Sequence, residues 1–196
     1  MSLGIEQGMA DQAVTRRNTV RLIVSLGLAA FLPLSAAAMS AGEIERRSRD
    51  QLQQLYRISP KSREVAARAK GILIFPKIVK AGLVVGGESG DGLLMRDGVS
   101  AGYFNISTLS VGLQAGAQSF AYVLFLMTDT AIAKVTSGDR WDIGTSPNIV
   151  VVDAGFLKEH NTFTLKKEVY AFPFGQKGLM AGLGLQGTVI QRVNRR

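Results

Sequence analysis

The chain has 196 residues, of which 46% are hydrophobic, and a formal net charge of +8. This length and composition suit one globular domain with an additional segment at one end. The absence of cysteine from the sequence excludes a disulfide framework, thiolate metal sites, a cysteine nucleophile and an acylated lipoprotein cysteine.

Residues 1–38 have the pattern of a bacterial export signal peptide. Arg16 and Arg17 precede an uncharged run that ends in small residues. This pattern predicts that the segment is removed, with cleavage before Met39 or before Ala41. An uncleaved membrane anchor is the alternative for the same run.

The sequence leaves two export routes open. Arg16 and Arg17 resemble the twin-arginine motif, but Thr19 stands where that motif usually has Phe, so Sec export is the alternative. Either route predicts an exported protein of the periplasm or envelope that is not integral to the membrane.

The signal contains three Lys/Arg and two Asp/Glu, so the mature chain keeps a formal charge of +7. For an exported protein, anionic phospholipid is a better partner for this charge than nucleic acid.

Residues 39–70 predict a helical, basic N-terminal segment of the mature chain. Five side chains recur near one face at the 3.6-residue spacing of an α-helix: Ile44, Ser48, Leu52, Leu55 and Tyr56. Ser59 and Pro60 predict the end of this helix and the start of a second one, with Ser59 as its N-cap. From residue 42 to residue 70 there are eight Lys/Arg against four Asp/Glu, which indicates either a solvated helix face or a membrane-contact face.

Residues 71–196 predict a β-rich domain. This part of the chain contains 18 of the 22 glycines, about twice the usual ~7%. Glycine within a strand costs roughly 0.5–1 kcal/mol relative to alanine, so this density indicates bulges, curvature or close approach of backbones. With the helices in front, the predicted fold class is α+β: a glycine-rich antiparallel β barrel or sandwich preceded by N-terminal helices. Candidate strands cover residues 71–76, 81–87, 92–98, 100–106, parts of 110–128, 148–154, 162–172, 178–186 and 188–193.

Local signals also predict turns and one short helix inside the β-rich domain. Residues 88–92 and 96–98 have the composition of hairpin turns. A helix is expected to begin after Thr128 or Asp129 and to end at Gly138.

Residues 110–128 carry no charge over nineteen positions, about the length that an α-helix needs to cross a bilayer. Gly112 and Gly116 repeat a G-L-x-x-G pattern that also begins at Gly82 and at Gly178, in runs too short to span a bilayer as helices. A lipid-facing helix would also leave the amides of two glutamines unsatisfied. The stretch is therefore predicted to be a buried strand pair or one long bent strand.

The sequence offers little for catalysis or metal binding. His160, the only histidine, lies in a polar loop, and the nucleophile, P-loop and zinc-binding motifs are missing. Glu88, Asp91 and Asp97 fit no calcium-loop spacing and are assigned to turns. No enzyme activity, cofactor or metal is expected.

Several motifs in the same order resemble the SYLF family of lipid-binding domains, which are also described as actin-binding in yeast. The motifs lie at residues 69–87, 112–128, 141–144, 150–155 and 169–193. The resemblance covers about residues 60–196 and implies binding to anionic phospholipid through basic residues and an N-terminal amphipathic helix. The segment 103–105 departs from the Trp-Ser-Ala-Pro type of eukaryotic relatives, which argues against phosphoinositide specificity and actin binding.

The predicted function is that of an exported envelope protein that binds anionic phospholipid at a membrane surface without catalysis. The alternative is a structural or protein-interaction module with an envelope protein partner. The resemblance supplies Lys77, Lys80 and Lys177 as candidate contacts, and the helical segment supplies the others. The candidate lipid-binding residues are Arg46, Arg47, Arg49, Arg57, Lys61, Arg63, Lys77, Lys80 and Lys177.

Overall fold

A computed structural model of the protein describes residues 39–82, 85–111, 116–138, 140–153, 166–175, 178–179 and 185–196. The predicted export signal, His160 and Lys177 lie outside these residues. The helices are α2 (Ala41–Ile58), α3 (Lys61–Ala66) and α4 (Asp129–Thr136). The strands are β1 (Gly71–Gly82), β2 (Val85–Arg96), β3 (Val99–Val111), β4 (Gly116–Leu126), β5 (Trp141–Asp142), β6 (Ile149–Val151), β7 (Val169–Gly175), β8 (Gly178–Leu179) and β9 (Thr188–Val193).

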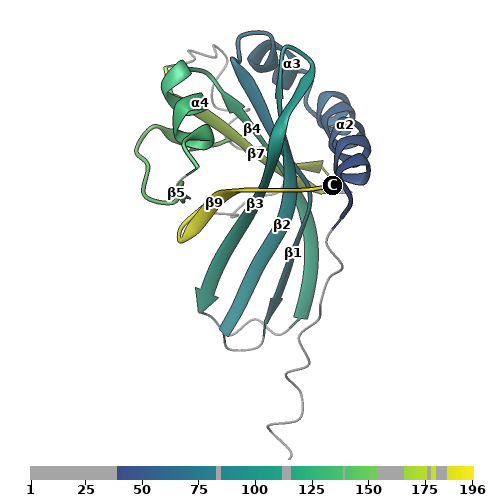
Figure 1. Ribbon diagram of the computed structural model, residues 1–196, viewed down its shortest axis with the longest axis vertical. Helices are drawn as coiled ribbons and strands as arrows, with labels where there is room; N and C mark the ends of the chain where they lie inside the picture. The colour runs from purple at the N-terminus through teal and green to yellow at the C-terminus, as the bar shows by residue number, and fades with distance from the viewer. Residues whose placement is uncertain are drawn as a thin grey trace, which may run out of the picture. The chain divides into compact units, whose positions relative to one another are not determined.

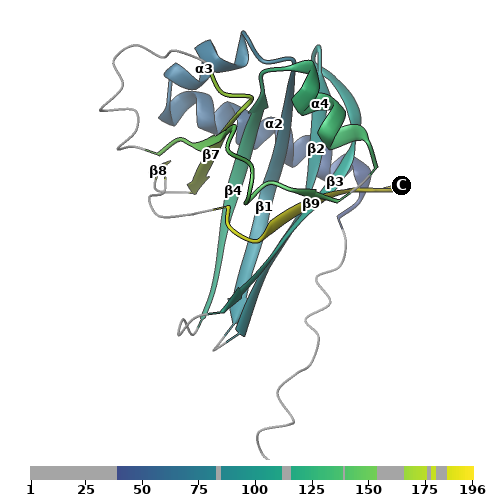
Figure 2. The ribbon, with the colours of Figure 1, turned by 90° about the vertical axis from the view of Figure 1, so that its left-hand side faces the viewer.

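Within the described residues, nine strands form one curled sheet in the order β5-β9-β3-β2-β1-β4-β7-β6, and β8 pairs with β7 (Figure 1). The α+β class is therefore confirmed. The prediction of a purely antiparallel sheet is wrong, because β6 runs parallel to β7. The described strands also do not form the two stacked sheets of a sandwich, since helices cover the sheet instead: α4 lies on one face and α2 on the other (Figure 2).

The uncharged stretch 110–128 contains the end of β3 and all of β4, not a membrane helix. No helix in the described residues is both long and apolar enough to cross a bilayer. The predicted strand pair is wrong in detail, because β1 and β2 lie between β3 and β4 in the sheet. In β4, Tyr122 and Leu124 pack into the core beneath α4, whereas Val123 and Phe125 pack into the core beneath α2. Burial on both faces explains why residues 120–126 of this run carry no charge.

The turn predicted at residues 88–92 is also wrong, because these residues lie within β2. A Cβ atom at Gly90 would come within 2.5 Å of the Lys77 carbonyl oxygen, and one at Gly92 within 2.4 Å of the Phe75 ring. These glycines therefore permit the close approach of β1, not a reversal of the chain. The turn predicted at 96–98 is confirmed: Asp97 and Gly98 join β2 to β3 with positive φ values of 51° and 77°.

The predicted amphipathic stripe on the first helix is confirmed: Ile44, Ser48, Leu52 and Leu55 are buried on α2. The second helix begins one residue later than predicted, since Ser59 ends α2 through a bond from its N–H to the Leu55 carbonyl and Pro60 is the N-cap of α3. The short helix α4 has the predicted start, with the Thr128 side chain accepting a hydrogen bond from the Ala131 N–H at 3.1 Å.

Asp91 is expected to be one of the more important polar residues for stability. Its carboxylate accepts two bonds from Arg195 Nη2, at 2.7 and 2.8 Å, and one from Asn105 at 3.0 Å, and its exposed fraction is 8%. Because Asp91→Ala would leave the guanidinium without its partner, we expect the free energy of unfolding to fall by about 2–3 kcal/mol. Urea denaturation measures this change.

The matched control is Asp129→Ala, which removes an exposed ion pair with Lys70 at 3.5 Å. That substitution is expected to cost less than about 1 kcal/mol. Equal losses of unfolding free energy in the two variants would show that the Asp91 network stabilises the fold no more than an exposed ion pair does.

Candidate basic groove between α2 and the sheet

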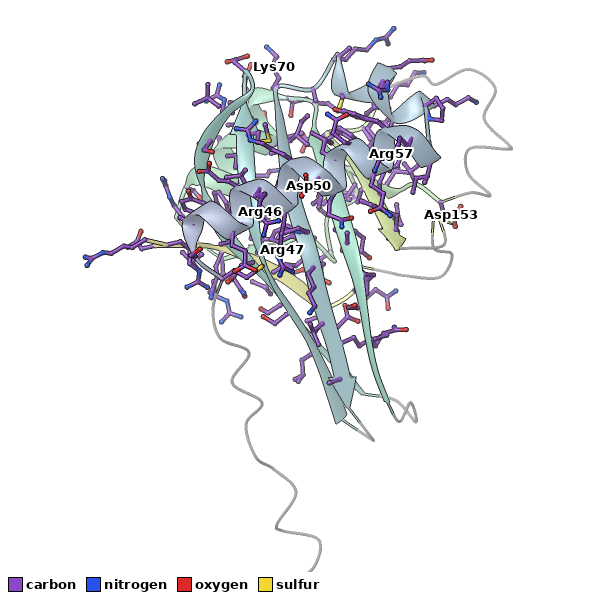
Figure 3. All side chains as sticks on the ribbon, turned by 90° about the vertical axis from the view of Figure 1, so that its right-hand side faces the viewer. Arg46, Arg47, Asp50, Arg57, Lys70 and Asp153 are labelled. Carbon is purple, nitrogen blue, oxygen red and sulfur yellow. The ribbon has the colours of Figure 1, made fainter. Side chains whose placement is uncertain are left out.

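A groove of about 440 Å³ lies between one flank of α2 and the sheet. Its helix side carries Arg46, Arg47 and Asp50, and Figure 3 shows these three labelled residues along α2, where the helix crosses the strands. The lining residues are Arg46, Arg47, Asp50, Gln51, Gln54, Pro76, Lys77, Ser119, Phe120, Ala121, Phe174 and Gly175. The groove thus combines a polar, charged wall from α2 with a floor from β1, β4 and β7.

The buried stripe and one hydrogen bond fix the rotation of α2 over the sheet. Ile44 and Leu55 are fully buried against the sheet. On the flank opposite the groove, the Tyr103 hydroxyl donates to Glu45 Oε1 at 2.6 Å. Since residues three and four positions apart share a helix flank, this orientation directs positions 46, 47, 50, 51 and 54 toward the groove.

A β-bulge in β1 supplies the lysine of the groove. The pairing of β1 with β4 shifts between Phe75 and Ile78, so Pro76 and Lys77 lie outside the regular ladder. Proline has no N–H to lose at such a position, and a bulge redirects the side chains around it. Gly90 in β2 supports the bulge, because any larger residue there would collide with the Lys77 carbonyl. Lys77 itself is exposed.

The floor of the groove is rigid and largely apolar. Phe120, Ala121 and Phe174 have exposed fractions of 4%, 3% and 0%. The Phe120 ring packs edge-on against Tyr122, with centroids 5.4 Å apart. Close packing of this kind fixes the backbones of β4 and β7 beneath α2.

The charges in the groove are mostly unpaired. Arg47 forms an ion pair with Glu43 at 2.7 Å, one helical turn away. Arg46, Asp50 and Lys77 make no ion pair or side-chain hydrogen bond within the described part of the chain. Three cations and one carboxylate therefore give the groove a net positive charge, which favours an anionic ligand.

One known protein family matches part of the chain. Residues 107–195 match the family model Ysc84, described as Las17-binding protein actin regulator. This match confirms the predicted SYLF resemblance. This part of the chain is therefore similar to the SYLF family. The search of curated proteins finds no match for the chain.

The SYLF match covers part of the groove. Strands β4 and β7, which form most of the floor, lie within residues 107–195, whereas α2 and β1 precede them. The family description names a binding module, and the basic wall of the groove is supplied by residues outside the match.

The structure brings together Arg46, Arg47 and Lys77 among the candidate lipid-binding residues. Arg49 lies apart from them, because its guanidinium approaches the Gly98 carbonyl at 3.5 Å. Lys177 lies outside the described residues.

Four further candidates lie away from the groove. Arg57 is exposed in the last turn of α2. Lys61 is half-buried in α3, and Arg63 stacks over the Tyr56 ring at 4.7 Å. Lys80 pairs with Glu88 across β1 and β2 at 2.9 Å, so its charge is already compensated. These residues do not extend the groove.

Sequence reasoning missed Asp50, Gln51 and Gln54 as groove residues. Their spacing from Arg47 is three, four and seven positions, which marks a second, polar stripe beside the apolar one. This pattern was visible in the sequence, but nothing in it indicated that the stripe lies over Phe120 and the β1 bulge.

The bond between Tyr103 and Glu45 is expected to make the attachment of α2 sensitive to pH. The hydrogen bond from Tyr103, and a second from Ser100, lower the pKa of Glu45. A lowered folded-state pKa contributes stability above the unfolded pKa of about 4.3, and this is lost as pH falls through the folded pKa. The same bond raises the pKa of Tyr103, so its contribution is lost as pH rises above about 10.

We therefore expect Tyr103→Phe to lower the free energy of unfolding by about 1 kcal/mol at pH 7 and by a smaller amount at pH 3, where protonation of Glu45 begins to replace the charge-assisted bond with a weaker neutral one. Urea denaturation at the two pH values checks this. A loss of equal size at both would show that the Tyr103 hydroxyl acts independently of the Glu45 carboxylate.

Proposed function

We propose that the protein is exported to the bacterial envelope and binds anionic phospholipid at a membrane surface, without catalysis. The observation that carries this proposal is the convergence of Arg46, Arg47 and Lys77 on one groove, where Arg46 and Lys77 have no acidic partner among the described residues. The SYLF match supports a binding module. The charge of the chain, +8, supports an anionic partner.

Electrostatic attraction is expected to dominate this binding. The apolar stripe of α2, which could have entered a bilayer, is buried against the sheet at Ile44, Leu52 and Leu55. Insertion of that face would require α2 to leave the domain. Each basic side chain near an anionic surface contributes about 1 kcal/mol, and physiological salt screens it beyond roughly 8–10 Å.

Vesicle flotation tests the proposal. The mature protein is expected to float with phosphatidylglycerol or cardiolipin vesicles at low salt, to dissociate as salt rises, and to bind phosphatidylcholine vesicles weakly. Failure to float with either anionic lipid at low salt would refute lipid binding.

A protein-interaction module is the second candidate function, and the family description, which refers to binding of the protein Las17, favours it. In this case the groove would receive an acidic segment of an envelope protein. Flotation would then be absent at any salt, and affinity purification from envelope extracts would recover one partner that Lys77→Glu releases.

The proposed export step predicts where the mature chain begins. Ser40 is the N-cap of α2 and accepts a bond from the Glu43 N–H at 3.3 Å, and Met39 packs against the core. Cleavage before Met39 keeps both residues, whereas cleavage before Ala41 removes them. We expect N-terminal sequencing to find Met39 first. A purified chain that begins at Ala41 should have a free energy of unfolding lower by about 1 kcal/mol.

A further inference from the structure

We infer that the groove is a discrete site for one phosphodiester headgroup that carries a hydroxyl or ammonium donor, as in phosphatidylglycerol or phosphatidylethanolamine. The inference rests on the proposed lipid binding and gives it a specific site and a selectivity. It differs from diffuse attraction of a basic surface, because it requires a fixed arrangement of both charge signs.

The cations of the groove fit a phosphate. Arg46 and Lys77 come from separate elements, α2 and the β1 bulge, and both are exposed and unpaired within the described residues. An arginine fork from α2 and a lysine ammonium from the β1 bulge that line one groove are suited to hold the oxygens of one phosphate. Arg47 adds a third cation, already oriented by its ion pair with Glu43.

Asp50 is the residue that makes the site selective. Its carboxylate lines the same groove and makes no ion pair or side-chain hydrogen bond within the described residues. A carboxylate repels phosphate but accepts hydrogen bonds from a hydroxyl or an ammonium group. A headgroup with a phosphate and a nearby donor satisfies both charge signs, whereas the choline headgroup has no N–H or O–H to offer.

The size of the groove fits a headgroup. Its volume of about 440 Å³ is within the roughly 300–1,000 Å³ range of small-molecule sites. The floor at Phe120 and Phe174 is closed and already packed, so acyl chains would remain outside. The site is therefore expected to bind the headgroup of a lipid whose acyl chains remain in the bilayer.

Calorimetric titration with monomeric short-chain lipids tests the selectivity. Dihexanoyl phosphatidylethanolamine and dihexanoyl phosphatidylcholine carry the same net charge and differ in the N–H donors. The wild-type protein is expected to prefer the ethanolamine lipid by about tenfold, the value of one charge-assisted hydrogen bond. Asp50→Asn is expected to reduce this preference to about twofold or less. An unchanged preference in Asp50→Asn would overturn the role of the carboxylate.

The cation sites and the source of the ligand are tested with dihexanoyl phosphatidylglycerol. Arg46→Gln with Lys77→Gln is expected to lower affinity at least about tenfold, whereas the control pair Arg68→Gln with Arg192→Gln, both exposed outside the groove, should leave it unchanged. Equal losses in the two pairs would overturn the inference. Glycerol 3-phosphate should bind more weakly than the lipid, and tighter binding would reassign the groove to a soluble phosphate ester.

Vesicle flotation of the wild-type protein distinguishes failure of the discrete headgroup site from failure of the proposed lipid binding. If the wild type floats with phosphatidylglycerol vesicles but short-chain lipids do not bind, diffuse lipid binding holds and the discrete site is wrong. If the wild type does not float at all, the proposed function itself fails.

Discussion

Gly92→Ala is expected to lower the free energy of unfolding by more than about 2 kcal/mol. A Cβ atom at this position would lie 2.4 Å from Phe75 Cδ1 and 2.6 Å from the Ile74 carbonyl oxygen. Phe75 is fully buried and the carbonyl belongs to the backbone of β1, so neither atom can move without shifting the sheet. Because β1 also carries the bulge at Lys77, the same change is expected to weaken lipid binding.

Gly42→Ala is the matched control for this prediction. Gly42 lies in the first turn of α2, and a Cβ atom added there would have no neighbouring atom within 4 Å. Alanine favours a helix over glycine by up to about 1 kcal/mol, so this variant should be equal to the wild type or slightly more stable. Urea denaturation compares the two. A Gly92→Ala protein with wild-type stability would contradict the close contact between β1 and β2.

Loss of the three groove cations is expected to have the largest effect on membrane binding. Arg46→Gln, Arg47→Gln and Lys77→Gln together should weaken binding to phosphatidylglycerol vesicles about 100-fold, since each cation contributes about 1 kcal/mol. The substitutions should leave the fold intact, because Arg46 and Lys77 are exposed and Arg47 is half-exposed on the surface of α2.

A charge-matched triple variant makes this prediction specific to the groove. Arg68, Arg96 and Arg192 are exposed and lie outside it. Their replacement by glutamine removes the same total charge, and screening over roughly 8–10 Å limits their effect, so we expect less than about a fivefold loss. Sedimentation of vesicles with both triple variants gives the comparison. Equal losses would show that total charge, not the groove, determines binding.

Local patterns were sufficient to predict several elements of the fold. The 3.6-residue spacing of Ile44, Ser48, Leu52 and Leu55 predicted the buried face of α2, because one helix face packs against one sheet. The two glutamines in residues 110–128 argued correctly against a membrane helix. The strand at residues 188–193 was predicted with the limits it has in β9.

Contacts between distant residues explain what the sequence could not predict. Gly90 and Gly92 have the composition of a turn, and only the position of β1 beside them shows that they permit close packing. Asp91 is paired with Arg195, 104 positions away. The groove likewise depends on the register of β1 with β4 and on the bulge between them, so Arg46 and Lys77 could be proposed as basic contacts but not as one site.

The central claim, that the groove faces the anionic membrane, is tested most directly with a single fluorescent label. The chain contains no cysteine, so Gln54→Cys places one environment-sensitive dye at the groove, and Ser137→Cys places the same dye at an exposed position after α4. With phosphatidylglycerol vesicles at low salt, we predict a blue shift of the emission at position 54, reversed by high salt, and no shift at position 137. A shift at position 137 alone, or vesicle binding with no shift at position 54, would contradict the claim.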